Sequence, residues 1–141
     1  MEENILIISS SEEFINDLEI KLKNIGYSNI KVLDNKEEAI LKVNKEQAKI
    51  IILDQDLKET NTSTKITERN GENIAIKLMQ DDIEIPIYFI GNQVEKYSDD
   101  NIIYKIDTTF EDAVNRLEKI MIQEQNKISQ KEDTNNNEII S

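Results

Sequence analysis

The run KIIILD at residues 49–54 decides how the chain is expected to fold. Its four apolar residues, Ile50 to Leu53, do not alternate with polar ones. Such a run is typical of a central strand in a parallel sheet that is covered on both faces. The run ends in a carboxylate, Asp54. Functional residues of open parallel sheets lie at the carboxyl ends of the strands, so Asp54 is the first candidate site residue.

Apolar runs and amphipathic segments alternate on both sides of this strand. The predicted strands are residues 5–8, 30–33, 50–53, 87–90 and 102–105, and the predicted helices are residues 12–25, a segment from Asn35, residues 71–81 and a segment from about Thr108 to Asn126. Ser10 and Glu13 have the spacing of a capping box at the first helix. Strands that alternate with helices predict βαβ units, and therefore an α/β fold with a parallel sheet.

The composition excludes several classes of function. The 141 residues contain no histidine and no cysteine, which excludes Ser-His-Asp and Cys-His mechanisms, disulfides and thiolate metal sites. The formal charge of −12, from 17 Lys and Arg against 29 Asp and Glu, argues against binding to nucleic acid or to an anionic membrane. No apolar run approaches the ~20 residues of a membrane span, and the acidic start lacks the basic region of a signal peptide. We expect a soluble cytoplasmic protein that is not an enzyme.

The apolar periodicity fades after about Asn126. Residues 127–141 are polar and include three consecutive asparagines, a composition that favours a frayed or disordered segment. The sequence therefore predicts one folded domain at residues 1–126, followed by a disordered C-terminal tail at residues 127–141.

Taken together and in this order, these segments resemble the CheY-like receiver domains of bacterial response regulators. The resemblance covers roughly residues 3–125 and rests on the order of the elements, on KIIILD, on EAI at residues 38–40, on IPI at residues 85–87 and on Lys105 at the end of the fifth strand. It implies a flavodoxin-like sheet with strand order 2-1-3-4-5 and helices on both faces. The folded domain at residues 1–126 is then receiver-like.

The resemblance assigns a role to two residues that this sequence retains. In the family, an aspartate at the end of the third strand accepts a phosphoryl group from a histidine kinase, and Asp54 stands at that position. A lysine at the end of the fifth strand pairs with the phosphoryl oxygens, and Lys105 matches it. A vestigial ion pair between these two residues is the structural alternative.

At four further positions the sequence departs from the family. Ser9 and Ser10 stand where two acidic residues help to bind Mg²⁺, Gly91 replaces a Thr or Ser that bonds the phosphoryl group, and Ile102 replaces the switch aromatic. Simpler roles exist: the serines suit helix N-terminal caps, and Gly91 suits a turn with positive φ.

The metal site implied by the resemblance is therefore reduced. Its protein ligands would be Asp54 and the backbone carbonyl of Asp56, whose side chain we expect to face solvent. Mg²⁺ usually requires a carboxylate or two, so we expect weak metal binding and no other cofactor. Glu12 or Glu13 at the start of the first helix is a possible replacement for the lost charge.

Two segment lengths also differ from the family. The connection from Asp54 to Gly71 is longer than usual, and its residues 55–70 are rich in Thr, Ser and Asn, which predicts a loop; loops of such length are often functional. The stretch from Gly91 to Ile102 is short, so we expect a short or missing fourth helix and a rebuilt output surface.

The leading hypothesis is a stand-alone atypical receiver, or pseudo-receiver, in a two-component phosphorelay. It would act by binding a signalling protein, a histidine kinase or a downstream effector, as a monomer or weak homodimer, with phosphorylation at Asp54 weak or lost. The first alternative is a working Mg²⁺-dependent phosphoacceptor, because Asp54 and Lys105 are kept. The second is a flavodoxin-like domain in which Ser9, Ser10 and Ser11 bind the phosphate of a small ligand at a helix N-terminus.

Overall fold

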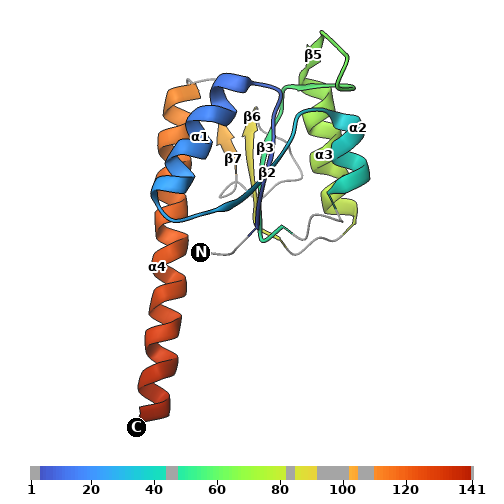
Figure 1. Cartoon of the computed structure of the whole chain (residues 1–141). Helices are drawn as coiled ribbons and strands as arrows, with labels where there is room; N and C mark the ends of the chain where they lie inside the picture. The colour runs from blue at the N-terminus through green and yellow to red at the C-terminus, as the bar shows by residue number, and fades with distance from the viewer. Residues whose placement is uncertain (1–3, 44–47, 82–84, 92–101, 105–109, 141) are drawn as a thin grey trace.

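The computed structural model describes residues 4–43, 48–81, 85–91, 102–104 and 110–140. Its centre is a five-stranded sheet with helices on both faces (Figure 1). The strands are β1 (Asn4–Ile8), β2 (Asn29–Leu33), β3 (Ile50–Asp54), β6 (Ile87–Gly91) and β7 (Ile102–Tyr104), in the order β2-β1-β3-β6-β7. Every neighbouring pair is parallel. The predicted α/β architecture and strand order are confirmed.

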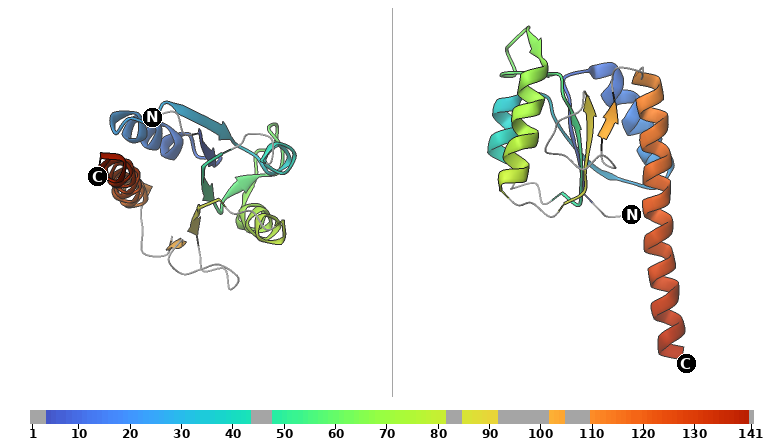
Figure 2. Two further views of the ribbon diagram at one scale, coloured as in Figure 1. Left: turned by 90° about the horizontal axis from the view of Figure 1, so that it is seen from below. Right: turned by 180° about the vertical axis from the view of Figure 1, so that it is seen from behind.

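Within the described residues, four helices cover the sheet. Figure 2 shows α1 (Glu12–Asn24) and α4 (Phe110–Ile140) on one face, and α2 (Lys36–Lys42) and α3 (Glu68–Gln80) on the other. The cap of α1 is Ser11, whose side chain accepts from the Phe14 N–H, so the prediction that Ser10 caps this helix is wrong. The cap of α2 is Asn35, as predicted.

The core divides into two clusters, one on each face of the sheet. Successive side chains of a strand point to opposite faces, and in β3 this sends Ile51 and Leu53 toward α2 and α3, and Ile50 and Ile52 toward α1 and α4. All five residues of β3 are buried, which confirms its predicted central position. The buried strand places Asp54 at the carboxyl edge of the sheet.

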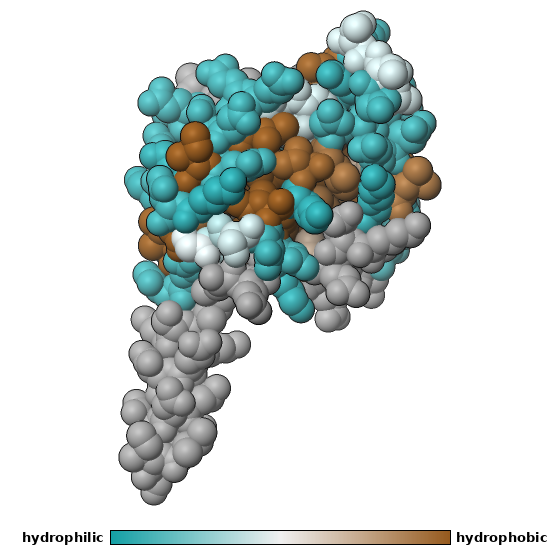
Figure 3. All heavy atoms as spheres, viewed as in Figure 1, coloured by the Kyte–Doolittle hydropathy of each residue, from teal (hydrophilic) through white to brown (hydrophobic). Residues whose placement is uncertain are grey.

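β2 is an edge strand, and apolar side chains gather in front of it (Figure 3). Its Ile30 and Val32 are half-buried and pack, with Ile15 of α1, against the cluster on the α1 and α4 face. From Asn29 to Val32, exposed and half-buried residues alternate, which fits a stretch of strand with one covered side. Leu33 at the end of β2 is buried on the α2 and α3 face.

The segment predicted as a loop at residues 55–70 contains regular structure. Two short strands, β4 (Leu57–Lys58) and β5 (Ile66–Thr67), pair antiparallel, and α3 begins at Glu68 rather than near residue 71. The loop prediction is wrong because Leu57 is fully buried in the core on the α2 and α3 face. A single leucine in a polar stretch is too short an apolar pattern to predict a buried strand. We call residues 55–67 the insertion.

At the C-terminus, the backbone of α4 is helical to Ile140 and extends past the edge of the sheet (Figure 1). A loss of order after Asn126 was expected there. The Glu, Gln and Lys residues of this stretch are good helix formers, although the stretch lacks an apolar stripe. The division of the chain into a domain and a tail stays a prediction.

The predicted short fourth helix falls at residues 92–101, outside the described residues. Among the helices that the structure does describe, none is long and apolar enough to cross a membrane.

Candidate functional site

The candidate site lies at the carboxyl edge of the sheet, where β1 and β3 end side by side. Ser9 Oγ donates a hydrogen bond of 2.9 Å to Asp54 Oδ2, and the Asp56 N–H donates one of 3.1 Å to Asp54 Oδ1. The Ser11 N–H donates in turn to Ser9 Oγ at 3.2 Å. Ser9 and Asp54 are both buried, at 0% and 1% exposure. Each oxygen of the buried carboxylate is therefore hydrogen-bonded within the protein, as buried polar groups require.

Ser10, which follows β1, links the end of β2 and the strand β4 at this edge of the sheet. Its hydroxyl donates to the Asp34 carbonyl at the end of β2 and accepts from the Lys58 N–H of β4 at 2.9 Å. Asn35 and Lys58 form a parallel bridge beside it. Both functions of the hydroxyl are used to hold the insertion against the sheet. We call Ser9, Ser10 and Asp54 the serine corner.

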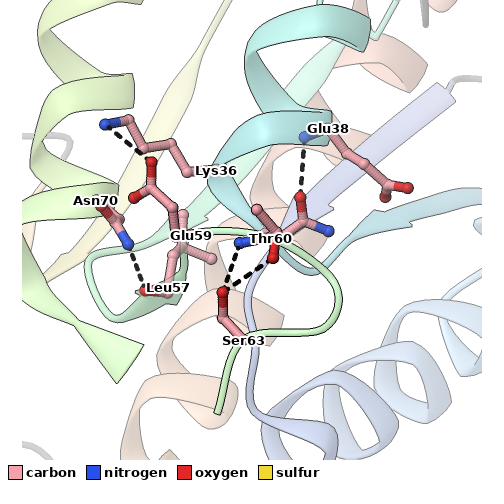
Figure 4. A network of polar contacts seen from close by, with 8 residues as sticks. Lys36, Glu38, Leu57, Glu59, Thr60, Ser63 and Asn70 are labelled. Carbon is pink, nitrogen blue, oxygen red and sulfur yellow. Dashed lines mark hydrogen bonds and ion pairs between the residues drawn. The ribbon is translucent and has the colours of Figure 1, made fainter. Parts of the chain in front are cut away.

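Further contacts fasten the insertion to the helices beside it (Figure 4). The Glu37 N–H donates to the Glu59 carbonyl at 3.0 Å, and Lys36 Nζ lies 3.9 Å from Glu59 Oε1. On the side of α3, the buried amide of Asn70 donates to the Leu57 carbonyl at 2.9 Å. The insertion is thus a fixed part of the carboxyl edge.

The turn of the insertion is held by its own polar side chains. The Thr60 N–H donates to Ser63 Oγ at 3.1 Å, and the two hydroxyls lie 2.9 Å apart (Figure 4). These hydroxyls add to the backbone bond from the Ser63 N–H to the Thr60 carbonyl, at 3.2 Å, where the chain reverses. The polar composition that suggested a loop in fact stabilises a hairpin turn.

Next to the serine corner, the chain passes through Gln55, whose N–H donates to the Ile90 carbonyl at 2.9 Å. The side chain of Gln55 is buried and lies against Gly91. Gly26 is the glycine with positive φ in the described chain, at 106°, so the prediction that Gly91 serves a positive-φ turn is wrong. Position 91 favours glycine because the side chain of Gln55 lies close to its backbone. The importance of Gln55 was not predicted.

The residues of the serine corner do not fit a magnesium ion. Mg²⁺ requires near-octahedral oxygen ligands, usually with one or two carboxylates. Here Asp54 is a single carboxylate, Ser9 directs its proton toward it, and both functions of the Ser10 hydroxyl are used. Within the part of the chain that the structure describes, no group of three or more acidic, His or Cys side chains is arranged to hold a metal. Asp56, expected to face solvent, is half-buried.

Glu12 and Glu13, the suggested replacements for the lost acids, are exposed in the first turn of α1. Negative side chains there favour the positive end of the helix dipole, which accounts for both residues without a metal.

Two site residues of the sequence analysis cannot be placed with the others. Lys105 lies outside the described residues, and of Ile102 the structure describes the backbone in β7. The phosphoryl-pairing role of Lys105, its ion pair with Asp54 and the switch position at Ile102 stay predictions. The hydroxyls of Ser9, Ser10 and Ser11 all have partners inside the protein, which disfavours the phosphate-binding alternative.

Tyr88 and Phe89 on β6 are core residues, with 8% and 0% exposure. Burial raises the pKa of the Tyr88 phenol, and the nearby carboxylate of Glu124 raises this pKa further. Tyr88 is therefore neutral at physiological pH and belongs to the face packed against α1 and α4.

No protein-family model matches the sequence, and no curated protein matches it significantly. Solved structures do match. The signal receiver domain of a putative LuxO repressor protein from Vibrio parahaemolyticus is 18% identical with a TM-score of 0.61, and the match covers 95% of this chain and 97% of that one.

Two further receiver domains agree. A CheY-like response regulator receiver domain from Methanospirillum hungatei is 16% identical with a TM-score of 0.58, covering 90% of this chain and 98% of that one. The receiver domain of NtrX from Brucella abortus is 12% identical with a TM-score of 0.57, covering 85% and 98%. At these identities the likeness concerns the fold: the chain has the fold of CheY-like response-regulator receiver domains.

Proposed function

We propose that this chain is an atypical receiver domain that acts in two-component signal transduction by binding a protein partner, with phosphorylation of Asp54 weak or lost. The receiver fold supports the pathway. The hydrogen bonding of Asp54 carries the rest of the proposal, because both carboxylate oxygens accept bonds from Ser9 and from the Asp56 N–H. This arrangement satisfies the buried charge without a ligand.

Phosphoryl transfer depends on positioning and on neutralisation of charge, mostly by metal ions. An attacking carboxylate needs an oxygen that is open to the donor, and a cation that screens the repulsion between two anions. Hydrogen bonds to a carboxylate stabilise its charged form and make each of its oxygens a weaker nucleophile. The second serine of the corner is held by the insertion. Among the described residues, neither Ser9 nor Ser10 therefore offers a second acid or a free hydroxyl to a metal ion beside Asp54.

The chemistry of the surface favours a protein as the partner. The net charge of −12 disfavours nucleic acid, because such binding draws on clustered cations. We propose a histidine kinase or a downstream effector of the same pathway as the partner class. Recognition would then depend on the constant shape of the domain rather than on a phosphorylated state.

A titration with Mg²⁺, with and without beryllofluoride, tests the proposal by NMR of backbone amides. Beryllofluoride imitates a phosphoryl group on aspartate. We expect the amides of Asp54, Asp56 and Gly91 to keep their chemical shifts in the wild type.

The matched control is Asp54→Asn, which keeps the side-chain size and removes the carboxylate that would accept a phosphoryl group. Wild-type shifts that saturate near millimolar Mg²⁺ and disappear in Asp54→Asn would show a working phosphoacceptor and contradict the proposal.

A further inference from the structure

Two of the three glycines in the chain contact one residue, Gln55. Gly91 lies at the end of β6 and Gly71 in the first turn of α3, so they approach Gln55 from two different elements. Gln55 itself is 4% exposed. We call Gln55, Gly71 and Gly91 the glycine corner.

At Gly91, the obstacle is the side chain of Gln55. A Cβ at position 91 would lie 2.6 Å from Gln55 Cβ and 2.9 Å from Gln55 Cδ, and nearer still to Gln55 Oε1. Carbon atoms in contact are ordinarily about 3.5–4.0 Å apart. Rotation about the inner bonds of the Gln55 side chain would move Oε1 and Cδ but not Cβ, and a buried side chain has little space to rotate into.

At Gly71, the obstacle is backbone. A Cβ there would lie 2.5 Å from the Asp54 carbonyl oxygen and nearer still to the Cα and the carbonyl oxygen of Gln55. The Gly71 N–H also donates to that Gln55 carbonyl at 3.0 Å. The start of α3 is therefore bonded directly to the end of β3.

We propose that Gln55 is the residue that closes the carboxyl edge between β3 and β6 and that makes glycine obligatory at position 91. With its N–H on β6, its carbonyl on α3 and its side chain over Gly91, Gln55 fixes the turn from which the Asp56 N–H reaches Asp54. The effect of Gln55 on Asp54 rests on the proposed function, in which the hydrogen bonds of Asp54 weaken its phosphorylation. With Gln55 present, no hydroxyl side chain fits at the end of β6 beside Asp54.

The geometry distinguishes the two glycines in a mutational test. Gly91→Ala should lower the midpoint of thermal unfolding by about 5–10 °C, because it overpacks a buried contact. Shortening Gln55 should restore stability in steps: Gln55→Ala removes two of the three clashing atoms, and Gln55→Gly removes all three. Gln55→Gly with Gly91→Ala should therefore be more stable than Gly91→Ala alone, although each substitution alone destabilises.

Gly71→Ala is the matched control. Its clash is with backbone atoms, so no substitution of the Gln55 side chain relieves it. Rescue of Gly91→Ala but not of Gly71→Ala by Gln55→Gly is the expected pattern. If Gly91→Ala does not fold alone, recovery of folding in the double variant is the expected result. A double variant no more stable than Gly91→Ala, or a Gly91→Ala protein as stable as the wild type, would overturn the inference.

Protection of the Asp56 N–H against hydrogen exchange reports on its bond to Asp54. In Gln55→Ala, which we expect to remain folded, this exchange should become faster by about tenfold beyond the change in global stability, because the turn that directs the Asp56 N–H to Asp54 relaxes. An exchange rate that changes only with global stability would contradict the positioning role of Gln55. A wild-type response to beryllofluoride would defeat the proposed function and leave the coupling of Gln55 and Gly91 intact, so the two failures are distinguishable.

Discussion

The serine corner and the glycine corner lie on either side of the same turn, yet they are held by different forces. At the serine corner, hydrogen bonds to Ser9 and Ser10 join β1, β2, β3 and the insertion. At the glycine corner, close packing of Gln55 joins β3, β6 and α3. The serine corner should therefore be sensitive to loss of a polar group, and the glycine corner to an added methyl group.

The largest effect is expected at the glycine corner. Gly71→Ala should lower the free energy of unfolding by about 3 kcal/mol, because a methyl group forced against backbone must displace α3 or β3. In an open helix the same change would be stabilising by about 1 kcal/mol, so the sign is diagnostic. Urea denaturation measures it, and an unchanged or raised stability would contradict the described contact.

At the serine corner, Ser9→Ala removes the hydroxyl that donates to the buried Asp54 carboxylate. Hydrogen bonds to charged groups contribute roughly 1.5–3 kcal/mol, so a loss of about 2 kcal/mol is expected in urea denaturation. Ser11→Ala is the comparison variant, since it removes the α1 cap at a cost of about 1 kcal/mol. Equal losses in the two variants would argue against a special role for Ser9.

Ser10→Ala should open the insertion locally. The Lys58 N–H loses its acceptor, and its hydrogen exchange should become faster by about tenfold, corresponding to a bond of about 1.4 kcal/mol. Asn61→Ala, at an exposed position in the insertion, should leave this exchange rate unchanged. Equal rates in wild type and Ser10→Ala would break the link between Ser10 and the insertion.

The smallest effect is expected at the ion pair of Lys36 and Glu59, whose atoms lie 3.9 Å apart with Glu59 largely exposed. Lys36→Ala should change the free energy of unfolding by less than about 0.5 kcal/mol. A larger loss in urea denaturation would show that this pair, rather than Ser10, fastens the insertion.

The sequence predicted the parts of the fold that depend on local patterns. The unbroken apolar run from Ile50 to Leu53 was sufficient to place β3 at the centre, because burial on both faces leaves such a run. Asn35 was recognisable as a cap because its partner, Glu38, is three residues away. Asp54 was identified because functional residues of a parallel sheet lie at the carboxyl ends of its strands.

The details of the site depend on distant contacts that no local pattern records. The partners of Ser10 are 24 and 48 residues away in the sequence, and nothing near Ser10 distinguishes it from a helix cap. Gln55 looked like an ordinary residue of a polar stretch, because its contacts with Gly91 on β6 and Gly71 on α3 are not visible in the local sequence. Similarly, Leu57 was one apolar residue among polar neighbours, too little to indicate a strand.

We propose that phosphorylation of Asp54 is weak or lost. Incubation of the wild type and of Asp54→Asn with acetyl phosphate and Mg²⁺, followed by intact-protein mass spectrometry, tests it most directly. We predict that neither protein gains the mass of a phosphoryl group. A gain in the wild type that is absent from Asp54→Asn would contradict the account and establish the chain as a phosphoacceptor.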